Sequence, residues 1–196
     1  MNEKIFWQYI DLTKEVATEG LGVRDIEERQ IWLIEEKLFL HSFEDVLEFH
    51  RIFSEKVYEL FLPTLAEVFM VSHSNYDTLK KGNVYISNDG FRDFRSWIVG
   101  LGREEFENFK TYQKEEDFLE YDLDPDNAYR EDLEYIIVDL YEGFKETEQD
   151  LTELEKIYER KYDFFYDGDY QSDLEEKIDW ANINQKYPRI LQRRET

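Results

Sequence analysis

The sequence predicts an all-α fold, a single multi-helix domain of seven or eight helices with at most one short strand pair. In most segments apolar residues recur at steps of three and four, which is the period of an amphipathic helix. Only residues 84–86 have the pattern of a short extended piece. The 196 residues include 15 Phe, 14 Tyr and 4 Trp, which is enough aromatic content to exclude a disordered chain.

Four helices are expected before a loop over residues 73–90. The first covers residues 5–16 and the second residues 25–40, each with charged residues on the face opposite its apolar stripe. Ser42 is the expected N-cap of the third helix. Pro63 restarts the chain into the fourth, because proline fits the first turn of a helix.

Further helical segments are expected after this loop. Gly100 and Gly102 end the first of them, and the acidic stretch 122–127 separates the second from the third. The expected ranges are residues 90–99, 103–112, 133–144 and 150–165.

Acidic charge is concentrated in the second half of the chain. The formal net charge is −23, and residues 104–179 hold 28 acidic side chains against 8 basic ones. We expect residues 1–179 to form the single helical domain, with residues 146–179 as an acidic helical extension. Residues 180–196 contain four basic side chains and little apolar periodicity, so we expect a loosely held basic C-terminal tail.

Composition also excludes several classes of function. Direct nucleic-acid binding is not expected, because phosphate affinity depends on Lys and Arg. There is no Cys, and the three His residues lack the spacing of metal ligands, so neither a metal site nor a cofactor is expected. No apolar run approaches the length that crosses a bilayer, and the start of the chain lacks the pattern of a signal peptide. We therefore expect a cytoplasmic protein.

Residues 87–106 contain the most specific pattern in the sequence. Ser87, Asn88 or Asp89 is expected to cap a helix whose aromatic residues enter the core. The pattern consists of Asp89, Gly90, Phe91, Phe94, Arg95, Trp97, Gly102 and Arg103, preceded near the start of the chain by Phe6 and Trp7.

This pattern resembles the bacterial domain-of-unknown-function family 4240. The resemblance spans residues 3–145, a family-like core, and leaves the acidic segment from residue 147 outside it. It implies no activity, substrate or cofactor. A structural role is expected for the residues of the pattern. In particular, Arg95 is expected to pair with a carboxylate of the first helix, Asp11 or Glu15.

The first functional hypothesis is a non-enzymatic protein-binding module of the immunity or antitoxin type. Its acidic face would block a basic protein partner, such as a toxin, because a strong negative field steers cationic surfaces toward it. Tyrosine side chains within the acid-rich runs would serve as anchors. The candidate binding residues are Asp163, Tyr166, Asp167, Asp169, Tyr170 and Asp173.

Two alternatives come from other functional classes. One is an enzyme with a carboxylate and arginine site made by Asp89, Arg95 and Arg103, together with His50 or Tyr85. The other is a nucleic-acid mimic or a regulatory scaffold, since carboxylates at phosphate-like spacing can occupy a DNA-binding surface. The sequence leaves the oligomeric state and the identity of the partner open.

Overall fold

The computed structural model confirms the all-α class. It describes residues 1–18, 23–73, 87–124, 127–145, 156, 174 and 176–193, and within these ranges it contains helices and no strand. The segments predicted at residues 84–86 and 150–165 lie outside the described residues, apart from Lys156. No helix in the described ranges is long and apolar enough to cross a membrane.

The chain packs into two compact units. The first unit comprises residues 1–56, 99–103 and 131–167, and the second comprises residues 57–98, 104–130 and 168–196.

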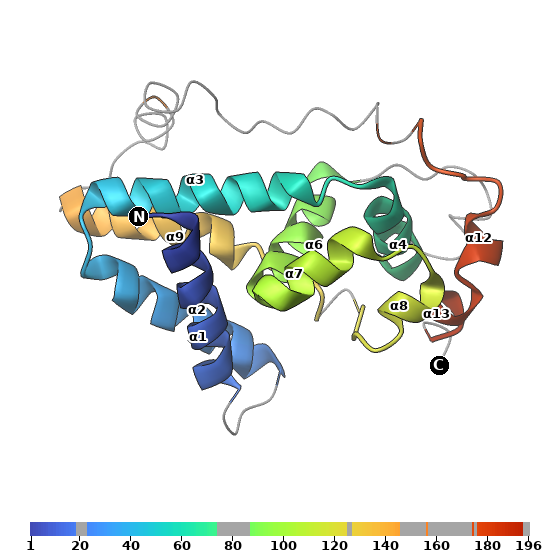
Figure 1. The fold of residues 1–196 in the computed structure, drawn as a ribbon, viewed down its shortest axis with the longest axis horizontal. Helices are drawn as coiled ribbons and strands as arrows, with labels where there is room; N and C mark the ends of the chain where they lie inside the picture. Colours follow the sequence, from blue (N-terminus) through green and yellow to red (C-terminus); the bar gives the residue numbers. More distant parts are fainter. Residues whose placement is uncertain are drawn as a thin grey trace. The chain divides into compact units, whose positions relative to one another are not determined.

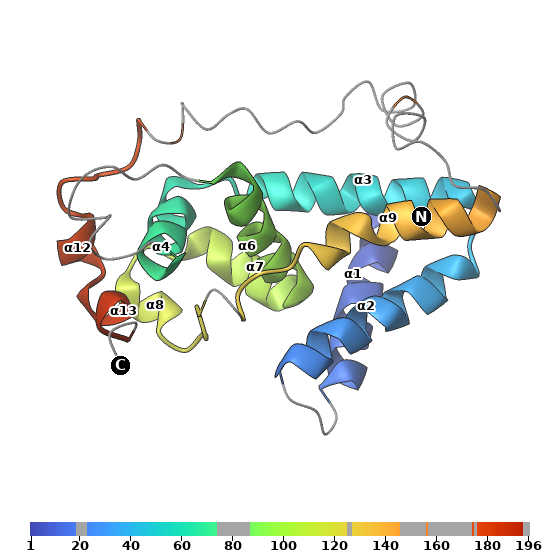
Figure 2. The ribbon, with the colours of Figure 1, turned by 180° about the vertical axis from the view of Figure 1, so that it is seen from behind.

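Helices α1, α2, α9 and the first part of α3 build the first unit (Figures 1 and 2). Their bounds are Glu3–Ala17 for α1, Val23–Phe39 for α2, Phe43–Glu59 for α3 and Asp132–Lys145 for α9. Both α1 and α9 pack against α2. The predicted ranges of these helices are therefore close to the observed ones.

Local sequence signals explain where these helices begin and which face they bury. The Asn2 side chain caps α1 by accepting a 3.1 Å hydrogen bond from the Ile5 amide. The Ser42 hydroxyl accepts from the Asp45 amide at 3.3 Å, which is the expected cap of α3. On α2, the buried Gln30 side-chain amide donates to the main-chain oxygens of Ile10 and Gly100. This buried amide therefore has two hydrogen-bond acceptors.

Within its described residues, the second unit contains the end of α3 and six further helices. These are α4 (Pro63–His73), α6 (Asn88–Gly100), α7 (Arg103–Thr111), α8 (Glu115–Phe118), α12 (Ile183–Lys186) and α13 (Pro188–Arg193). Helix α4 is buried continuously from Leu65 to Ser72, so it forms the centre of this unit. The aromatic core around it includes Phe69, Phe91, Phe94, Trp97 and Phe109.

The C-terminal segment differs from the loosely held tail that its charge suggests. Residues 183–193 form α12 and α13, and both helices pack against α4. Four apolar side chains hold them there, since Ile183, Tyr187, Ile190 and Leu191 are all at most 8% exposed. The basic side chains of this segment remain at its surface.

Candidate functional site

The candidate binding residues of the acidic extension cannot be placed. Asp163, Tyr166, Asp167, Asp169, Tyr170 and Asp173 all lie outside the described residues.

Most aromatic residues of the motif are core residues. Phe6, Trp7, Phe91, Phe94 and Trp97 are at most 6% exposed. The first turn of α6 is capped by the Ser87 hydroxyl, which accepts a 3.3 Å hydrogen bond from the Gly90 amide, while Asp89 is exposed. The ring of Phe69 packs closely on Gly90. A Cβ added at residue 90 would lie 3.1 Å from that ring.

Arg95 is buried, and it acts through main-chain acceptors. Its Nε donates to the Phe91 carbonyl at 3.1 Å, and an Nη donates to the Val57 carbonyl at 3.0 Å. The guanidinium also lies over the rings of Phe61 and Phe91, at 5.1 and 4.7 Å from their centroids. These contacts tie α6 to the end of α3.

Asp11 joins α1 to the turn before α7. Its Oδ1 accepts a 2.8 Å hydrogen bond from the Arg103 amide. The adjacent Gly102 has a φ of +101°, and a Cβ there would lie 2.7 Å from the same Asp11 oxygen. Glycine is thus required at this turn both for its backbone angle and for the close approach of the carboxylate.

The residues of the enzyme alternative belong to different units of the chain. Asp89 and Arg95 belong to the second unit, Arg103 belongs to the first, and Tyr85 lies outside the described residues. His50 is half-buried on α3, within the first unit. Among the residues that the structure describes, no group of three or more His, Asp or Glu side chains is arranged to hold a metal ion.

The outward face of α2 is the most unusual surface of the first unit. Trp32, Phe39 and Leu40 are 53%, 62% and 85% exposed, although large apolar side chains are the usual content of a core. On the inner face of the same helix, Ile34 and Leu38 are fully buried. Two residues along a helix correspond to a rotation of roughly 200°, so Trp32 lies opposite the buried Ile34.

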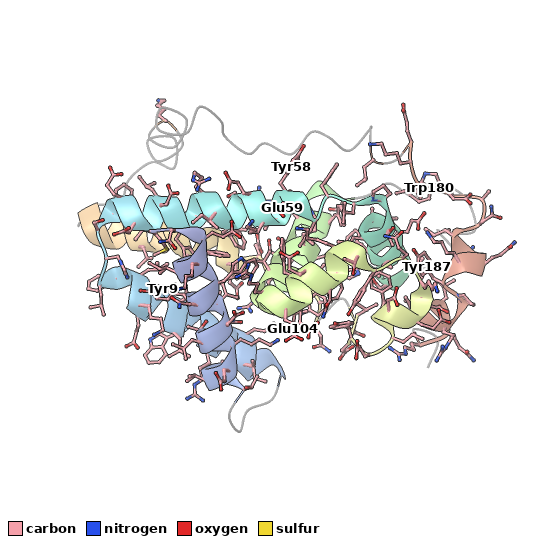
Figure 3. The ribbon with its side chains drawn as sticks, viewed as in Figure 1. Tyr9, Tyr58, Glu59, Glu104, Trp180 and Tyr187 are labelled. Carbon is pink, nitrogen blue, oxygen red and sulfur yellow. The ribbon has the colours of Figure 1, made fainter. Side chains whose placement is uncertain are left out.

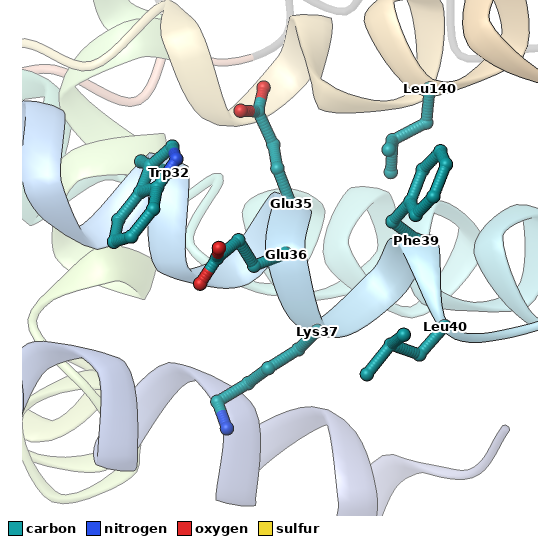
Figure 4. A pocket seen from close by; sticks show the side chains of 7 residues that line it. All are labelled: Trp32, Glu35, Glu36, Lys37, Phe39, Leu40 and Leu140. Atoms are coloured by element: carbon teal, nitrogen blue, oxygen red, sulfur yellow. The ribbon is translucent and has the colours of Figure 1, made fainter.

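These exposed side chains border a hollow of about 670 Å³ (Figure 4). Its walls are Trp32, Glu35, Glu36, Lys37 and Phe39 from the second half of α2, Leu40 from the turn after it, and Leu140 from α9. We call these seven residues the α2 hollow. Apolar walls with a few charged groups are typical of recognition surfaces, because the apolar part provides binding energy and the charges provide orientation.

The position of Lys37 leaves the charge of the hollow acidic. Its ammonium lies over the ring of Tyr9 on α1, 5.6 Å from the centroid (Figure 3 labels Tyr9). Figure 4 shows the Lys37 side chain extending away from Leu140 and Phe39. The carboxylates of Glu35 and Glu36 are therefore the charges nearest to the apolar walls along α2.

Polar contacts fix the end of α2 beside this hollow. The Tyr9 hydroxyl and His41 Nε2 are 2.6 Å apart, and His41 Nδ1 is 3.6 Å from Asp45 Oδ2. Asp45 also binds the amino group of Met1, and that hydrogen bond holds the pKa of the Asp45 carboxyl below its ordinary value. The hollow is thus built on a helix end that is anchored to α1 and α3.

Two carboxylates of the second unit, those of Glu67 and Glu115, are buried, in contrast to those of the α2 hollow. Glu67 of α4 is 4% exposed and binds the Lys186 ammonium and, at 2.8 Å, the Tyr187 hydroxyl (Figure 3 labels Tyr187). Burial raises the pKa of the Tyr187 hydroxyl above its ordinary range, so this group stays protonated and donates. Buried Glu115 accepts from the amides of Arg189 and Ile190 at 2.5 and 2.9 Å, which caps α13.

Sequence reasoning passed over the α2 hollow although its signal was present. The stripe through Ile26, Ile31, Ile34 and Leu38 accounts for one face of the helix, and it leaves Trp32, Phe39 and Leu40 unexplained on the other. A second apolar stripe on an acidic helix indicates an additional contact surface. The role of Leu140 required the structure, because it depends on how α9 packs against α2.

Comparison with known proteins gives one match. The sequence model of a family described as "Protein of unknown function (DUF4240)" matches residues 1–143. No curated protein and no solved structure matches the chain. The matched range contains α2 and nearly all of α9, hence every residue of the α2 hollow.

Proposed function

The chain belongs to the DUF4240 family, and from this premise we propose that it is a non-enzymatic protein-binding module that takes a basic protein partner on the α2 hollow. An immunity or antitoxin type of action fits this proposal, in which the module occupies and blocks a cytoplasmic partner. The observation that carries the proposal is the joint exposure of Trp32, Phe39 and Leu40 beside two glutamates.

Energetics support an interface at this surface. Exposed Trp and Leu side chains on the rim of a hollow lose apolar surface to water when a partner covers them, at about 25 cal/mol per Å². Trp is also among the residues that most often dominate binding energy. Because α2 is anchored by its buried face, a partner would meet a largely preformed surface.

Charge supports a basic partner over a second copy of this chain. A net charge of −23 on each molecule opposes self-association, whereas it accelerates encounter with a cationic surface. Glu35 and Glu36 place negative charge next to the apolar contact residues. The expected ligand surface therefore combines apolar side chains with Lys or Arg.

Panning random 12-residue peptides displayed on phage against the full chain tests the proposal. The wild-type protein is the bait, and a Trp32→Ala/Leu40→Ala double variant is the counter-bait. Leu12→Ala serves as the matched control, because Leu12 is an exposed apolar residue of α1, 45% exposed, that does not line the hollow. Circular dichroism verifies that all three proteins are folded.

We expect selected peptides to be basic, to carry an apolar residue, and to bind the Leu12→Ala protein like wild type while losing at least tenfold in affinity for the double variant. Binding should weaken as salt rises, because exposed charges are screened within roughly 8 Å at physiological ionic strength. Peptides that bind the double variant equally well, or a pool with no basic preference, would overturn the proposal. So would dimerisation of the wild-type chain that the double substitution abolishes.

A further inference from the structure

The outward face of α2 has a regular order of side chains. Trp32 and Glu36 lie four residues apart on α2, so they are neighbours along one row of the helix, and Leu40 follows in the turn directly after the helix ends at Phe39. Trp32 and Glu36 are about 6 Å apart along the helix axis, from a rise of about 1.5 Å per residue. The row and the turn after it therefore present an aromatic ring, a carboxylate and an aliphatic side chain in sequence.

We infer that this row is a subsite for an arginine side chain of the partner, an inference that rests on the proposed function of the α2 hollow. The guanidinium stacks on the Trp32 ring and pairs with the Glu36 carboxylate. An apolar side chain of the partner, about one helical turn from that arginine, packs on Leu40, Phe39 and Leu140.

The chemistry of the row favours arginine over lysine. A guanidinium is planar, stacks on aromatic rings and makes two parallel hydrogen bonds to a carboxylate, whereas an ammonium is a compact and strongly hydrated point charge. Trp is the ring that attracts cations most strongly, and its indole here is 53% exposed. In the second unit the Arg95 guanidinium lies over two Phe rings, so stacking of a guanidinium on aromatic rings already occurs in this protein.

Lys37 does not occupy the subsite. Its ammonium is directed to the ring of Tyr9, and this contact keeps the cation of α2 apart from the row. An arginine from the partner would then meet the carboxylate of Glu36 without an intramolecular competitor from that lysine.

The probe for the test is a capped, alanine-based peptide with one arginine and, four residues later, one leucine. Its twins carry citrulline, which is neutral and nearly isosteric, or lysine in place of arginine. Binding to the full chain is followed by ¹H–¹⁵N spectroscopy of the indole N–H signals, with the Trp32 signal assigned by its loss in Trp32→Phe. Trp7 and Trp97 are buried and act as internal controls.

We expect the arginine peptide to shift the Trp32 signal, with affinity at least fivefold above that of the citrulline and lysine twins. Glu36→Gln should remove this preference while leaving the residual affinity for the citrulline peptide unchanged. Equal binding of all three peptides at Trp32 would overturn the arginine subsite and leave the docking surface standing. A Trp32 signal that no peptide shifts would also overturn the subsite, whereas the panning experiment decides the proposed function independently.

Discussion

Glu67 of α4 and Glu36 of α2 are glutamates of two helices with opposite surroundings. Glu67 is 4% exposed, and its carboxylate binds Lys186 and Tyr187 within the second unit. Glu36 lines an open hollow between exposed apolar side chains of the first unit. The 47 acidic residues of the chain thus include buried carboxylates that bind donors of the same unit and exposed carboxylates that line an open surface.

The comparison shows which acidic residues carry information about function. A buried carboxylate is costly unless donors surround it, so its partners explain its presence. An exposed carboxylate does not need such partners. Only its neighbours can therefore indicate whether it has a function. For Glu36, those neighbours are Trp32 and Leu40, which the fold does not bury.

The largest effect should come from removing the buried carboxylate of Glu67. In Glu67→Ala the Tyr187 hydroxyl keeps its buried position without this acceptor, and a cavity replaces the side chain. The free energy of unfolding should fall by about 2–3 kcal/mol. The loss should not exceed this range, because the Lys186 ammonium is partly exposed and regains water when its partner is removed. Urea denaturation followed by circular dichroism measures it.

Glu36→Ala is the matched control, and its free energy of unfolding should stay within about 0.5 kcal/mol of wild type. Equal losses in the two variants would break the distinction between buried and exposed carboxylates.

A smaller loss is expected where Glu115 caps α13. Glu115→Ala deprives the amides of Arg189 and Ile190 of their acceptor, so the free energy of unfolding should fall by about 1–2 kcal/mol. Glu115→Gln keeps a side-chain oxygen and should recover at least half of that loss. The neighbouring Glu116→Ala should change stability by less than about 0.5 kcal/mol, because its contact with Arg189 is long and exposed. Similar losses at both positions would contradict the capping role.

Trp32→Ala should leave stability nearly unchanged. Its indole is 53% exposed, so we expect the free energy of unfolding to change by less than about 0.5 kcal/mol. Thermal melts of the variant and wild type check this. A loss above about 1.5 kcal/mol would show that Trp32 serves the fold, and it would remove the main observation behind the docking surface.

The smallest effect concerns an exposed carboxylate with structural partners, Asp117 of α8. Hydrogen bonds from the amides of Gln113 and Lys114 lower the pKa of the Asp117 carboxyl in the folded state. Its charge therefore contributes stability above the unfolded pKa of about 4, and this contribution is lost as the pH falls through the folded value. The difference in urea midpoint between wild type and Asp117→Asn should shrink from pH 6 to pH 3. A difference that stays constant would show that the charge contributes nothing.

The longer helices of the first 145 residues could be predicted from their apolar period, whereas the four-residue α8 was not predicted. Ser42 was expected as a cap, and Ser87 is the one of three candidate caps, Ser87, Asn88 and Asp89, whose hydroxyl accepts from the first turn of α6. The two C-terminal helices also carry a helical spacing, with Ile183, Tyr187, Ile190 and Leu191 at steps of four, three and one. Pro188 divides that stripe into two short helices, and the four basic residues of the segment obscured it.

The partners of charged side chains were harder to predict. The structural role expected of Arg95 depends on the carbonyls of Phe91 and Val57. Every residue has a main-chain carbonyl, so residue identity does not show which carbonyls accept from Arg95. The exposure of Trp32 is likewise a tertiary property, since the sequence shows a second apolar stripe and does not show whether another helix covers it.

The buried carboxylates of the second unit also constrain its biosynthesis. The side-chain donors to Glu67 follow it in the chain by 119 and 120 residues, and the main-chain amides that donate to Glu115 follow it by 74 and 75. At about 5–20 residues per second, the ribosome delivers the partners of Glu67 roughly 6–24 s after Glu67 itself. During that interval α4 must keep its carboxylate hydrated, and its apolar residues cannot close around it. The last step in the maturation of this unit therefore waits until residues 186 and 187 have been synthesised, and nascent chains that stall before residue 187 should be clients for chaperones.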